Sequence, residues 1–162
     1  MSAPAFELEN VGSGPDRFSL STLDGQADAA VLLFQRDHYC TNCRKQVRAV
    51  ADRYGEFRER HAEVVSIVPE PPERVREWQD AYDLPYPLLA DPDVSAGEAY
   101  DQPVRFGFLG DLSDFVGRMP EVVIVDLRGE PEIAWNHAGS STFDRPSIDE
   151  ILDRLDALLA DG

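Results

Sequence analysis

The chain has few cysteines, few lysines and no long apolar run. Its 162 residues include two cysteines, Cys40 and Cys43, and one lysine, Lys45. A disulfide framework needs cysteines spread along the chain, so this pair does not link distant segments, and a chain of this length buries a core without such links.

No segment approaches the roughly 18 apolar residues of a membrane span. Residues 1–10 carry neither a charged nor an apolar leader, so we expect a cytoplasmic protein with one domain, residues 1–162, and no membrane contact.

Positive charge is also scarce. The chain has 15 lysines and arginines against 31 acidic residues, a formal net charge of -16 at pH 7. A dense carboxylate surface keeps a protein hydrated and dispersed at molar salt, where screening acts over about 3 Å. The composition is typical of a halophilic protein and predicts self-repulsion, with loss of structure, at low salt. Because no basic stripe is present to neutralise phosphates, we expect no nucleic-acid partner.

Apolar periodicity predicts an alternation of strands and helices. A pair of short strands around a turn is expected within residues 6–20, and the apolar run 30–34 is expected to be the central strand of the sheet. Further strands are predicted at 64–68, 121–126 and 133–137, and helices at 43–57, 71–82, 94–100 and 147–159. The last helix opens with Ser147 as N-cap and Glu150 three residues later. The stretch 106–115 has no clean period and is expected to be a loop.

The two cysteines lie where a buried strand gives way to an amphipathic helix. The free N–H groups and dipole at a helix start amount to roughly half a positive charge, which favours thiolate over thiol. In such a place the pKa of a cysteine falls from about 8.5 to between roughly 3.5 and 7.5. Arg44 and Lys45 follow Cys43, and His38 precedes Cys40 by two residues, so each is expected to support the thiolate. The pattern indicates redox chemistry.

Two other uses of a cysteine pair fit less well. A buried inert pair is disfavoured because the flanking residues are polar and positively charged. Structural zinc needs four ligands, and His38, His61 and His137 are not spaced to complete such a set. We therefore expect no metal. No nucleotide or flavin motif is present either, so no cofactor is expected and electrons must arrive through another dithiol protein.

Two segments outside the cysteine pair resemble a known family. Residues 14–25, which include Gly-Pro-Asp-Arg-Phe-Ser-Leu and Leu-Asp-Gly, are similar to its opening, and residues 86–92 with Tyr100 are similar to its middle signature. The family is the alkyl hydroperoxide reductase and thiol-specific antioxidant (AhpC/TSA) group of peroxiredoxin-like redoxins, within the thioredoxin superfamily. The resemblance covers nearly the whole chain. It implies an α/β thioredoxin fold, with three α/β/α layers, a central mixed β-sheet and an N-terminal β-hairpin of the peroxiredoxin type.

The cysteine region departs from the peroxiredoxin pattern. That pattern is Pro-x-x-x-Thr-x-x-Cys, and the corresponding positions here hold Arg36, Cys40 and Cys43. The buried acid that thioredoxins keep on the preceding strand is also replaced by an apolar residue. The resemblance therefore leaves proton transfer to water or to another group, with Asp37 and His38 as candidates.

The family also has a distant arginine, placed just before a strand that ends in aspartate. Counted back from Asp126, that position holds Pro120, and Arg118 stands two residues earlier. In thioredoxin-like proteins the same position carries a cis-proline that faces the cysteines. The resemblance therefore implies that Met119 and Pro120 bind substrate, together with Tyr39 beside the motif, and that a shift of the loop brings Arg118 near the site.

Three functions remain open. In the first, a thiol-disulfide oxidoreductase, Cys40 attacks a protein or small-molecule disulfide and Cys43 resolves the mixed disulfide. In the second, a thiol peroxidase, Cys43 reacts with a hydroperoxide and Cys40 resolves the sulfenic acid. A dithiol protein such as thioredoxin would return either to the reduced state. The third is a redox-sensing binding module that uses the apolar loop 104–115, a segment that is otherwise expected to be a core flap or the contact of a homodimer.

Overall fold

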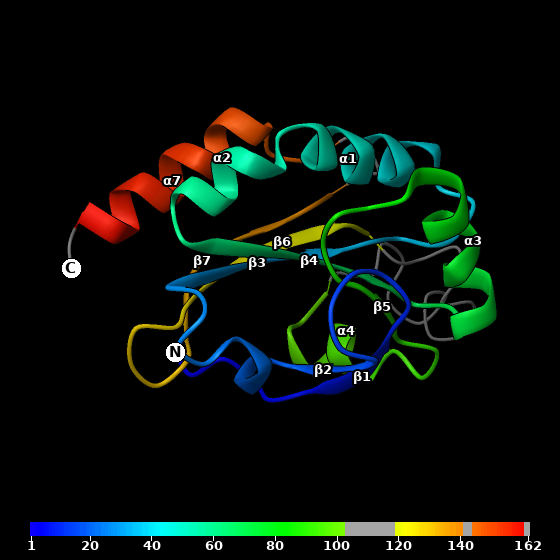
Figure 1. The fold of residues 1–162 in the computed structure, drawn as a ribbon, viewed down its shortest axis with the longest axis horizontal. Helices are drawn as coiled ribbons and strands as arrows, with labels where there is room; N and C mark the ends of the chain where they lie inside the picture. The colour runs from blue at the N-terminus through cyan, green and yellow to red at the C-terminus, as the bar shows by residue number, and fades with distance from the viewer. Residues whose placement is uncertain (103–118, 141–143, 161–162) are drawn as a thin grey trace.

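A seven-stranded mixed sheet forms the centre of the molecule (Figure 1). The computed structural model describes residues 1–102, 119–140 and 144–160, and within them the strand order is β2-β1-β5-β4-β3-β6-β7. β3, β4 and β5 are parallel, whereas β1, β2, β6 and β7 pair antiparallel with their neighbours. The strands are β1 (Glu7–Asn10), β2 (Arg17–Ser19), β3 (Ala29–Phe34), β4 (Ala62–Val68), β5 (Leu88–Ala90), β6 (Glu121–Asp126) and β7 (Glu132–Ala138).

Helices cover both faces of this sheet. In Figure 1, α1, α2 and α7 lie along one face, and α4 lies on the opposite side. The helices are α1 (Thr41–Asp52), α2 (Tyr54–Glu59), α3 (Pro72–Tyr82), α4 (Ser95–Ala99) and α7 (Ile148–Ala160), with a short 3-10 helix η1 (Leu20–Leu23). The arrangement is the three-layer thioredoxin fold expected from the sequence. None of the helices in the described part of the chain is long and apolar enough to cross a membrane.

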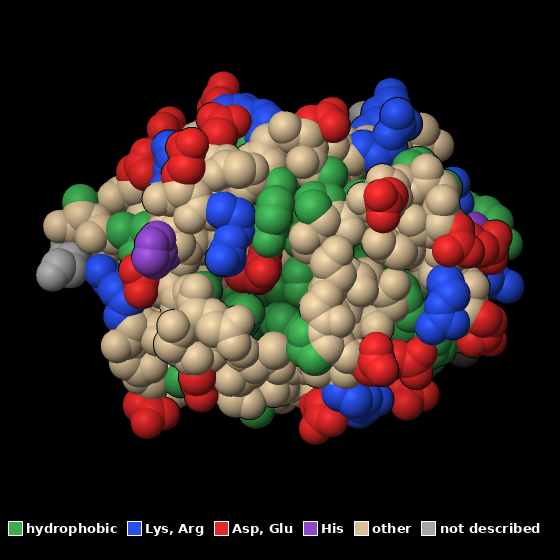
Figure 2. Space-filling view, viewed as in Figure 1, with side chains coloured by type: hydrophobic (Ala, Val, Ile, Leu, Met, Phe, Trp, Pro, Cys, Tyr) green, Lys and Arg blue, Asp and Glu red, His purple; other side chains and the backbone are tan. Residues whose placement is uncertain are grey.

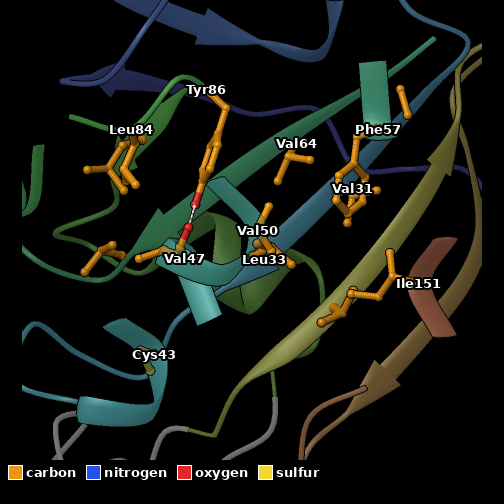
Figure 3. Close-up of a cluster of buried hydrophobic side chains, with 14 of the residues drawn as sticks. Val31, Leu33, Cys43, Val47, Val50, Phe57, Val64, Leu84, Tyr86 and Ile151 are labelled. Atoms are coloured by element: carbon orange, nitrogen blue, oxygen red, sulfur yellow. Dashed lines mark hydrogen bonds between the residues drawn. The ribbon is translucent and has the colours of Figure 1, made fainter. Parts of the chain in front are cut away.

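The strand before the cysteines is apolar on both faces because it divides two hydrophobic clusters. All six residues of β3 are buried, as expected for a strand with helices on both sides. Val31 and Leu33 pack with Val47 of α1 and other residues on one face, which Figure 3 shows. Leu32 and Phe34 face the other cluster.

A buried tyrosine ties α1 to the sheet. The Tyr86 hydroxyl donates to the Val47 carbonyl at 2.9 Å (Figure 3), and the Ser66 hydroxyl lies 3.4 Å from the Tyr86 oxygen. Val47 stands one helical turn after Cys43. The contact therefore fixes the first turns of α1, which contain Cys43, against the sheet.

Most predicted elements are confirmed, with three differences. β1 and β2 pair as the expected hairpin, with Leu8 opposite Phe18. β3 lies inside the sheet, but the middle position belongs to β4. The helix predicted over 43–57 ends at Asp52 and resumes at Tyr54, and β5 was not predicted because three residues carry too little periodicity. The loop predicted at 106–115 lies outside the described residues.

Candidate active site

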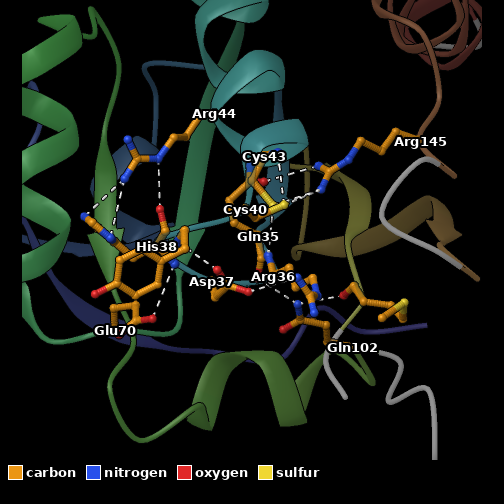
Figure 4. Close-up of polar contacts among 12 residues, drawn as sticks. Gln35, Arg36, Asp37, His38, Cys40, Cys43, Arg44, Glu70, Gln102 and Arg145 are labelled. Carbon is orange, nitrogen blue, oxygen red and sulfur yellow. Dashed lines mark hydrogen bonds and ion pairs between the residues drawn. The ribbon is translucent and has the colours of Figure 1, made fainter. Parts of the chain in front are cut away.

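Both cysteines stand at the first turn of α1, directly after the loop that leaves β3 (Figure 4). Cys40 is the N-cap residue, and its Sγ accepts the backbone N–H of Cys43 at 3.2 Å. The Sγ of Cys43 accepts the backbone N–H of Arg36 at 3.3 Å. Both thiols are free. Cys40 keeps 4% of its surface exposed and Cys43 none, so Cys40 is the outer member of the pair.

The two thiols differ sharply in acidity. The pKa of Cys40 is lowered to about 6, chiefly because the Cys43 thiol donates a hydrogen bond to it. Burial opposes that shift, while the Cys43 backbone N–H and the Arg145 guanidinium add to it. Burial raises the pKa of Cys43, and the hydrogen bond that it gives to Cys40 raises it further. The pair therefore holds its negative charge on the outer sulfur and its proton on the inner one.

Arg145 is the cation that faces the cysteines. Its Nη2 lies 2.9 Å from the Sγ of Cys43 and 3.6 Å from the Sγ of Cys40. Its Nη1 donates to the side-chain oxygens of Gln46, at 2.9 Å, and of Gln35, at 3.3 Å. Because both glutamines accept a hydrogen bond from the same nitrogen, the guanidinium is held in one orientation toward the sulfurs (Figure 4).

Contacts of Asp144 with the end of β7 support the neighbouring Arg145. The carboxylate of Asp144 contacts His137 Nε2 at 2.8 Å and accepts the N–H and hydroxyl of Ser140 at 2.8 and 2.9 Å. The two contacts from Ser140 and the one from His137 hold the pKa of Asp144 down at about 2. Gly139 fits closely at the same place, because a Cβ there would stand 2.8 Å from the Asp144 carbonyl oxygen and 2.9 Å from that of Pro120.

His38 and Arg44 contact each other rather than the sulfurs. Arg44 Nε donates to the His38 carbonyl at 2.9 Å, and its guanidinium carbon lies 5.6 Å from the centre of the Trp78 ring. Burial, followed by the charge of Arg44, lowers the pKa of His38. This shift disfavours the protonated imidazole, the form in which His38 would support the thiolate.

Tyr39 and Asp37 both precede Cys40, but Tyr39 is exposed and Asp37 is buried. Tyr39 is 59% exposed, and the Arg74 guanidinium lies 5.7 Å from the centre of its ring. Asp37 is buried; it accepts the Tyr39 N–H at 2.7 Å and pairs with Arg36 at 3.3 Å. Its charge raises the pKa of Cys40, so Asp37 lies close enough to act on the outer thiol.

Comparison with known proteins places this site in a family. The model of the AhpC/TSA family matches residues 1–130. The chain belongs to the AhpC/TSA family. A peroxiredoxin of Mycobacterium tuberculosis is 32% identical over 108 residues, which cover 65% of this chain and 66% of that relative. The thiol-disulfide oxidoreductase ResA of Oceanobacillus iheyensis is 24% identical over 144 residues, 88% of this chain and 66% of the relative. The matched region thus spans just under two thirds of each relative's length.

Solved structures show the same fold. The reduced 2-Cys peroxiredoxin of Plasmodium vivax superposes with a TM-score of 0.80 at 21% identity, covering 99% of this chain and 95% of that one. The relatives of this chain are named as peroxiredoxins and as thiol-disulfide oxidoreductases.

The segment just before β6, which the sequence predicts to bind substrate, differs from expectation. Met119 and Pro120 lie beside the end of β3, since Gln102 Nε2 donates to the carbonyls of both Gln35, at 3.0 Å, and Met119, at 2.9 Å. Both are buried, which leaves little of their side chains for a substrate to touch. No peptide bond among the described residues is cis, so the expected cis-proline at Pro120 is wrong. Arg118 lies outside those residues.

The arginine that does reach the cysteines was not found from the sequence. Arg145 stands 102 residues after Cys43 and beyond residue 130, where the AhpC/TSA match ends. Its neighbours Pro146 and Ser147 indicate the start of a helix, but no sequence spacing connects Arg145 to the two cysteines. Among the described residues, no group of three or more His, Cys, Asp or Glu side chains is arranged to hold a metal.

Proposed function

We propose that this protein is a thiol-disulfide oxidoreductase in which Cys40 attacks and Cys43 resolves. The observation that carries the proposal is that the outer sulfur bears the negative charge while the inner sulfur keeps its proton. Cys40, at the open end of α1, has its pKa lowered to about 6, so it is a thiolate at neutral pH. Cys43 is fully buried and keeps its proton. This is the order that an exchange reaction requires, with a charged outer nucleophile and a protonated inner thiol in reserve.

The reaction balances with two electrons. The Cys40 thiolate forms a bond to one sulfur of the substrate disulfide, the substrate S–S bond breaks, and the first thiolate leaves. Cys43 then loses its proton to that leaving thiolate, its sulfur attacks Cys40, and the second substrate thiolate departs and takes a proton from water. The substrate disulfide is reduced to two thiols and the protein dithiol is oxidised to a Cys40–Cys43 disulfide, which a dithiol protein such as thioredoxin reduces.

Thiol peroxidase activity is the second candidate, and one observation favours it. Two donors converge on Cys43, the Arg145 guanidinium at 2.9 Å and the Arg36 N–H at 3.3 Å. Such donors stabilise a Cys43 thiolate during attack on a hydroperoxide. The sulfenic acid formed with release of water or alcohol would then condense with Cys40 and release a second water. Complete burial of Cys43 and its raised pKa weigh against this order.

Single-cysteine variants distinguish the two reactions. Reduced wild type, Cys40→Ser and Cys43→Ser are mixed in molar KCl with a small disulfide or with hydrogen peroxide, and thiol loss is followed by stopped flow. For the oxidoreductase we expect wild type to end as an internal disulfide, Cys43→Ser to stop as a mixed disulfide on Cys40, and Cys40→Ser to be inert. Mass spectrometry identifies the adduct.

A different pattern of reactivity among these variants would favour the peroxidase instead. If Cys40→Ser reacts with hydrogen peroxide far faster than a free thiol, and Cys43→Ser forms no mixed disulfide, the nucleophile is Cys43. Equal and slow reaction of all three proteins with both reagents would contradict both activities.

A further inference from the structure

A groove lies beside the two cysteines, between α1 and the segment that leads into α7. Its volume is about 300 Å³, at the small end of the range for ligand pockets. One wall is a single face of α1, formed by Asn42, Lys45, Gln46 and Ala49 at three- and four-residue steps. The other wall is residues 145–148. Arg145 belongs to this wall and also contacts both sulfurs, so the groove and the cysteine pair share this side chain.

The charge of this groove is opposite to that of the molecule. Of the described residues that line it, two are basic, Lys45 and Arg145, and none is acidic, although the chain carries a net charge of -16. Figure 2 shows Lys and Arg side chains gathered over α1 at the upper right, on a surface where Asp and Glu are widespread. A negatively charged ligand is therefore attracted to this place and repelled from most of the rest.

The two cations have different roles. Arg145 is engaged by the sulfurs and by two glutamines. Lys45 is exposed and has no ion-pair partner among residues 1–102, 119–140 and 144–160, whereas Arg53 and Arg60 further along pair with Asp149 and Asp156. In a protein with a twofold excess of acidic residues, a solvent-facing ammonium beside the site is available for a ligand carboxylate.

The apolar residues of the groove set the kind of molecule that fits. Ala49, Pro146 and Ile148 add hydrocarbon surface to the same groove as Lys45 and Arg145. A ligand that matches these features has a carboxylate for Lys45, a short aliphatic stem for the apolar lining, and a sulfur directed past Arg145 to Cys40. The small volume excludes a folded partner from the groove itself.

We propose that this groove selects small-molecule disulfides that carry a carboxylate, which Lys45 binds while the disulfide reaches Cys40. The inference rests on the thiol-disulfide exchange proposed above and names its substrate class. The electron balance is the one given there: Cys40 bonds to one sulfur of the anionic disulfide, the other half leaves as a thiolate, and Cys43 releases the second half as the protein dithiol becomes a disulfide.

The test uses three disulfides that differ in their terminal groups. Bis(2-carboxyethyl), bis(2-hydroxyethyl) and bis(2-aminoethyl) disulfide carry negative, zero and positive charge. Their second-order rate constants with the reduced protein are measured at one KCl concentration at which the protein is folded. Each is divided by the rate of the same disulfide with a free monothiol, because the pKa of the leaving thiol also affects the rate. We expect the normalised rates to fall from the anion to the neutral compound to the cation.

Lys45→Gln should remove most of this preference. We expect the anion-to-cation ratio to drop roughly threefold to tenfold, the effect of one unit charge a few ångströms away near a protein surface. The rate with the neutral disulfide is the reference for both, so that any change in the acidity of Cys40 cancels from the ratio. The matched control is Arg17→Gln, which removes an exposed charge on β2 that pairs with Glu7. A ratio that falls equally in both variants, or equal normalised rates for all three disulfides in wild type, would overturn the proposal.

A second readout separates the groove from the reaction. Alkylation of Cys40 by iodoacetate, an anion, is compared with alkylation by neutral iodoacetamide in the Cys43→Ser background, with and without Lys45→Gln. A ratio that depends on Lys45 supports the cationic groove even if no disulfide is reduced, in which case the proposed function fails alone. A ratio that ignores Lys45, together with normal disulfide reduction, refutes the groove and leaves the function standing.

Discussion

At the scale of single residues, the site works by keeping the negative charge on the sulfur of Cys40 and the proton on that of Cys43. Cys40 and Cys43 are three residues apart, yet their pKa values shift in opposite directions, because burial raises both while the hydrogen bond between them lowers that of Cys40 and raises that of Cys43. The hydrogen bond from Cys43 is the largest contribution to the acidity of Cys40. Arg145 and Asp37 then act on the same thiol with opposite sign. The reactivity of Cys40 is therefore a balance of one buried thiol, one cation and one carboxylate.

This balance predicts a pH profile. A thiolate is the reactive form, so the rate of Cys40 alkylation by iodoacetamide should rise with pH and level off above a midpoint of about 6. Arg145→Gln removes the cation that favours the thiolate, and we expect the midpoint to rise by about one pH unit. Asp37→Asn removes the carboxylate that opposes it, so the midpoint should fall.

The profile is measured by mass spectrometry of quenched samples in the Cys43→Ser background and in wild type. Cys43→Ser alone should move the midpoint only partway toward that of a free thiol, because a serine hydroxyl still donates a hydrogen bond. A midpoint that stays the same in Arg145→Gln would show that the guanidinium does not act on Cys40.

At the scale of secondary structure elements, two segments far apart in the chain build the site. The β3–α1 junction supplies the cysteines, and the segment between β7 and α7 supplies Arg145. Asp144, the residue before this arginine, binds Ser140 and His137 at the end of β7. The chain is also packed tightly at Gly139, where any larger residue would displace the backbone. The position of the cation thus depends on contacts that do not involve the cysteines.

Asp144→Ala tests that dependence. We expect the variant to lose part of the hold on Arg145, so the midpoint for Cys40 alkylation should rise in the same direction as in Arg145→Gln, by a smaller amount. The pKa of Asp144 is lowered to about 2, so its contribution is complete above the ordinary carboxyl pKa near 3.8 and is lost as the pH falls through about 2. It is therefore constant across the alkylation range.

The control is Asp126→Ala, which removes an aspartate that pairs with Arg128 at 3.0 Å at the other end of β6. It should leave the midpoint unchanged. An equal shift in the two variants would mean that the effect comes from the net charge of the protein and not from the contacts of Asp144.

At the scale of the whole molecule, the dominant feature is the excess of negative charge. Asp and Glu side chains are spread over the face shown in Figure 2, and the surface ion pairs each contribute little, because exposed pairs are screened and flexible. Self-repulsion of a net charge of -16 opposes the compact state unless salt screens it.

We therefore expect stability to depend strongly on salt. The melting temperature, followed by circular dichroism, should rise steeply between dilute buffer and molar KCl, and dialysis into dilute buffer should cause loss of structure. Sucrose at matched water activity serves as the control, because it strengthens burial without screening charge. A melting temperature that is flat across the KCl series would contradict the halophilic interpretation.

The elements of the fold were predictable where local pattern is strong. The apolar run of β3, the amphipathic face of α1 and the capped start of α7 each carry their own periodicity, and the structure confirms them. β5 and the break near Arg53 were not predictable, because a three-residue strand and a single non-helical residue are decided by neighbours in space. The expectation of a cis-proline at Pro120 was wrong because it rested on the position of this residue in the sequence. The geometry of a peptide bond depends on the contacts around it, which the sequence does not give.

The sequence by itself determined the chemistry of the site: two cysteines at the junction of a strand and a helix, where backbone dipoles favour a thiolate. Only the tertiary structure decided which cysteine is charged, because that depends on how deeply each is buried. It also decided which cation faces them. Arg44 and Lys45 follow the cysteines in sequence, but Arg44 contacts His38 and Trp78 and Lys45 lines the neighbouring groove, while Arg145 arrives from 102 residues away. Helical geometry turns neighbouring side chains to different sides, and only packing of the chain brings the distant one to the sulfurs.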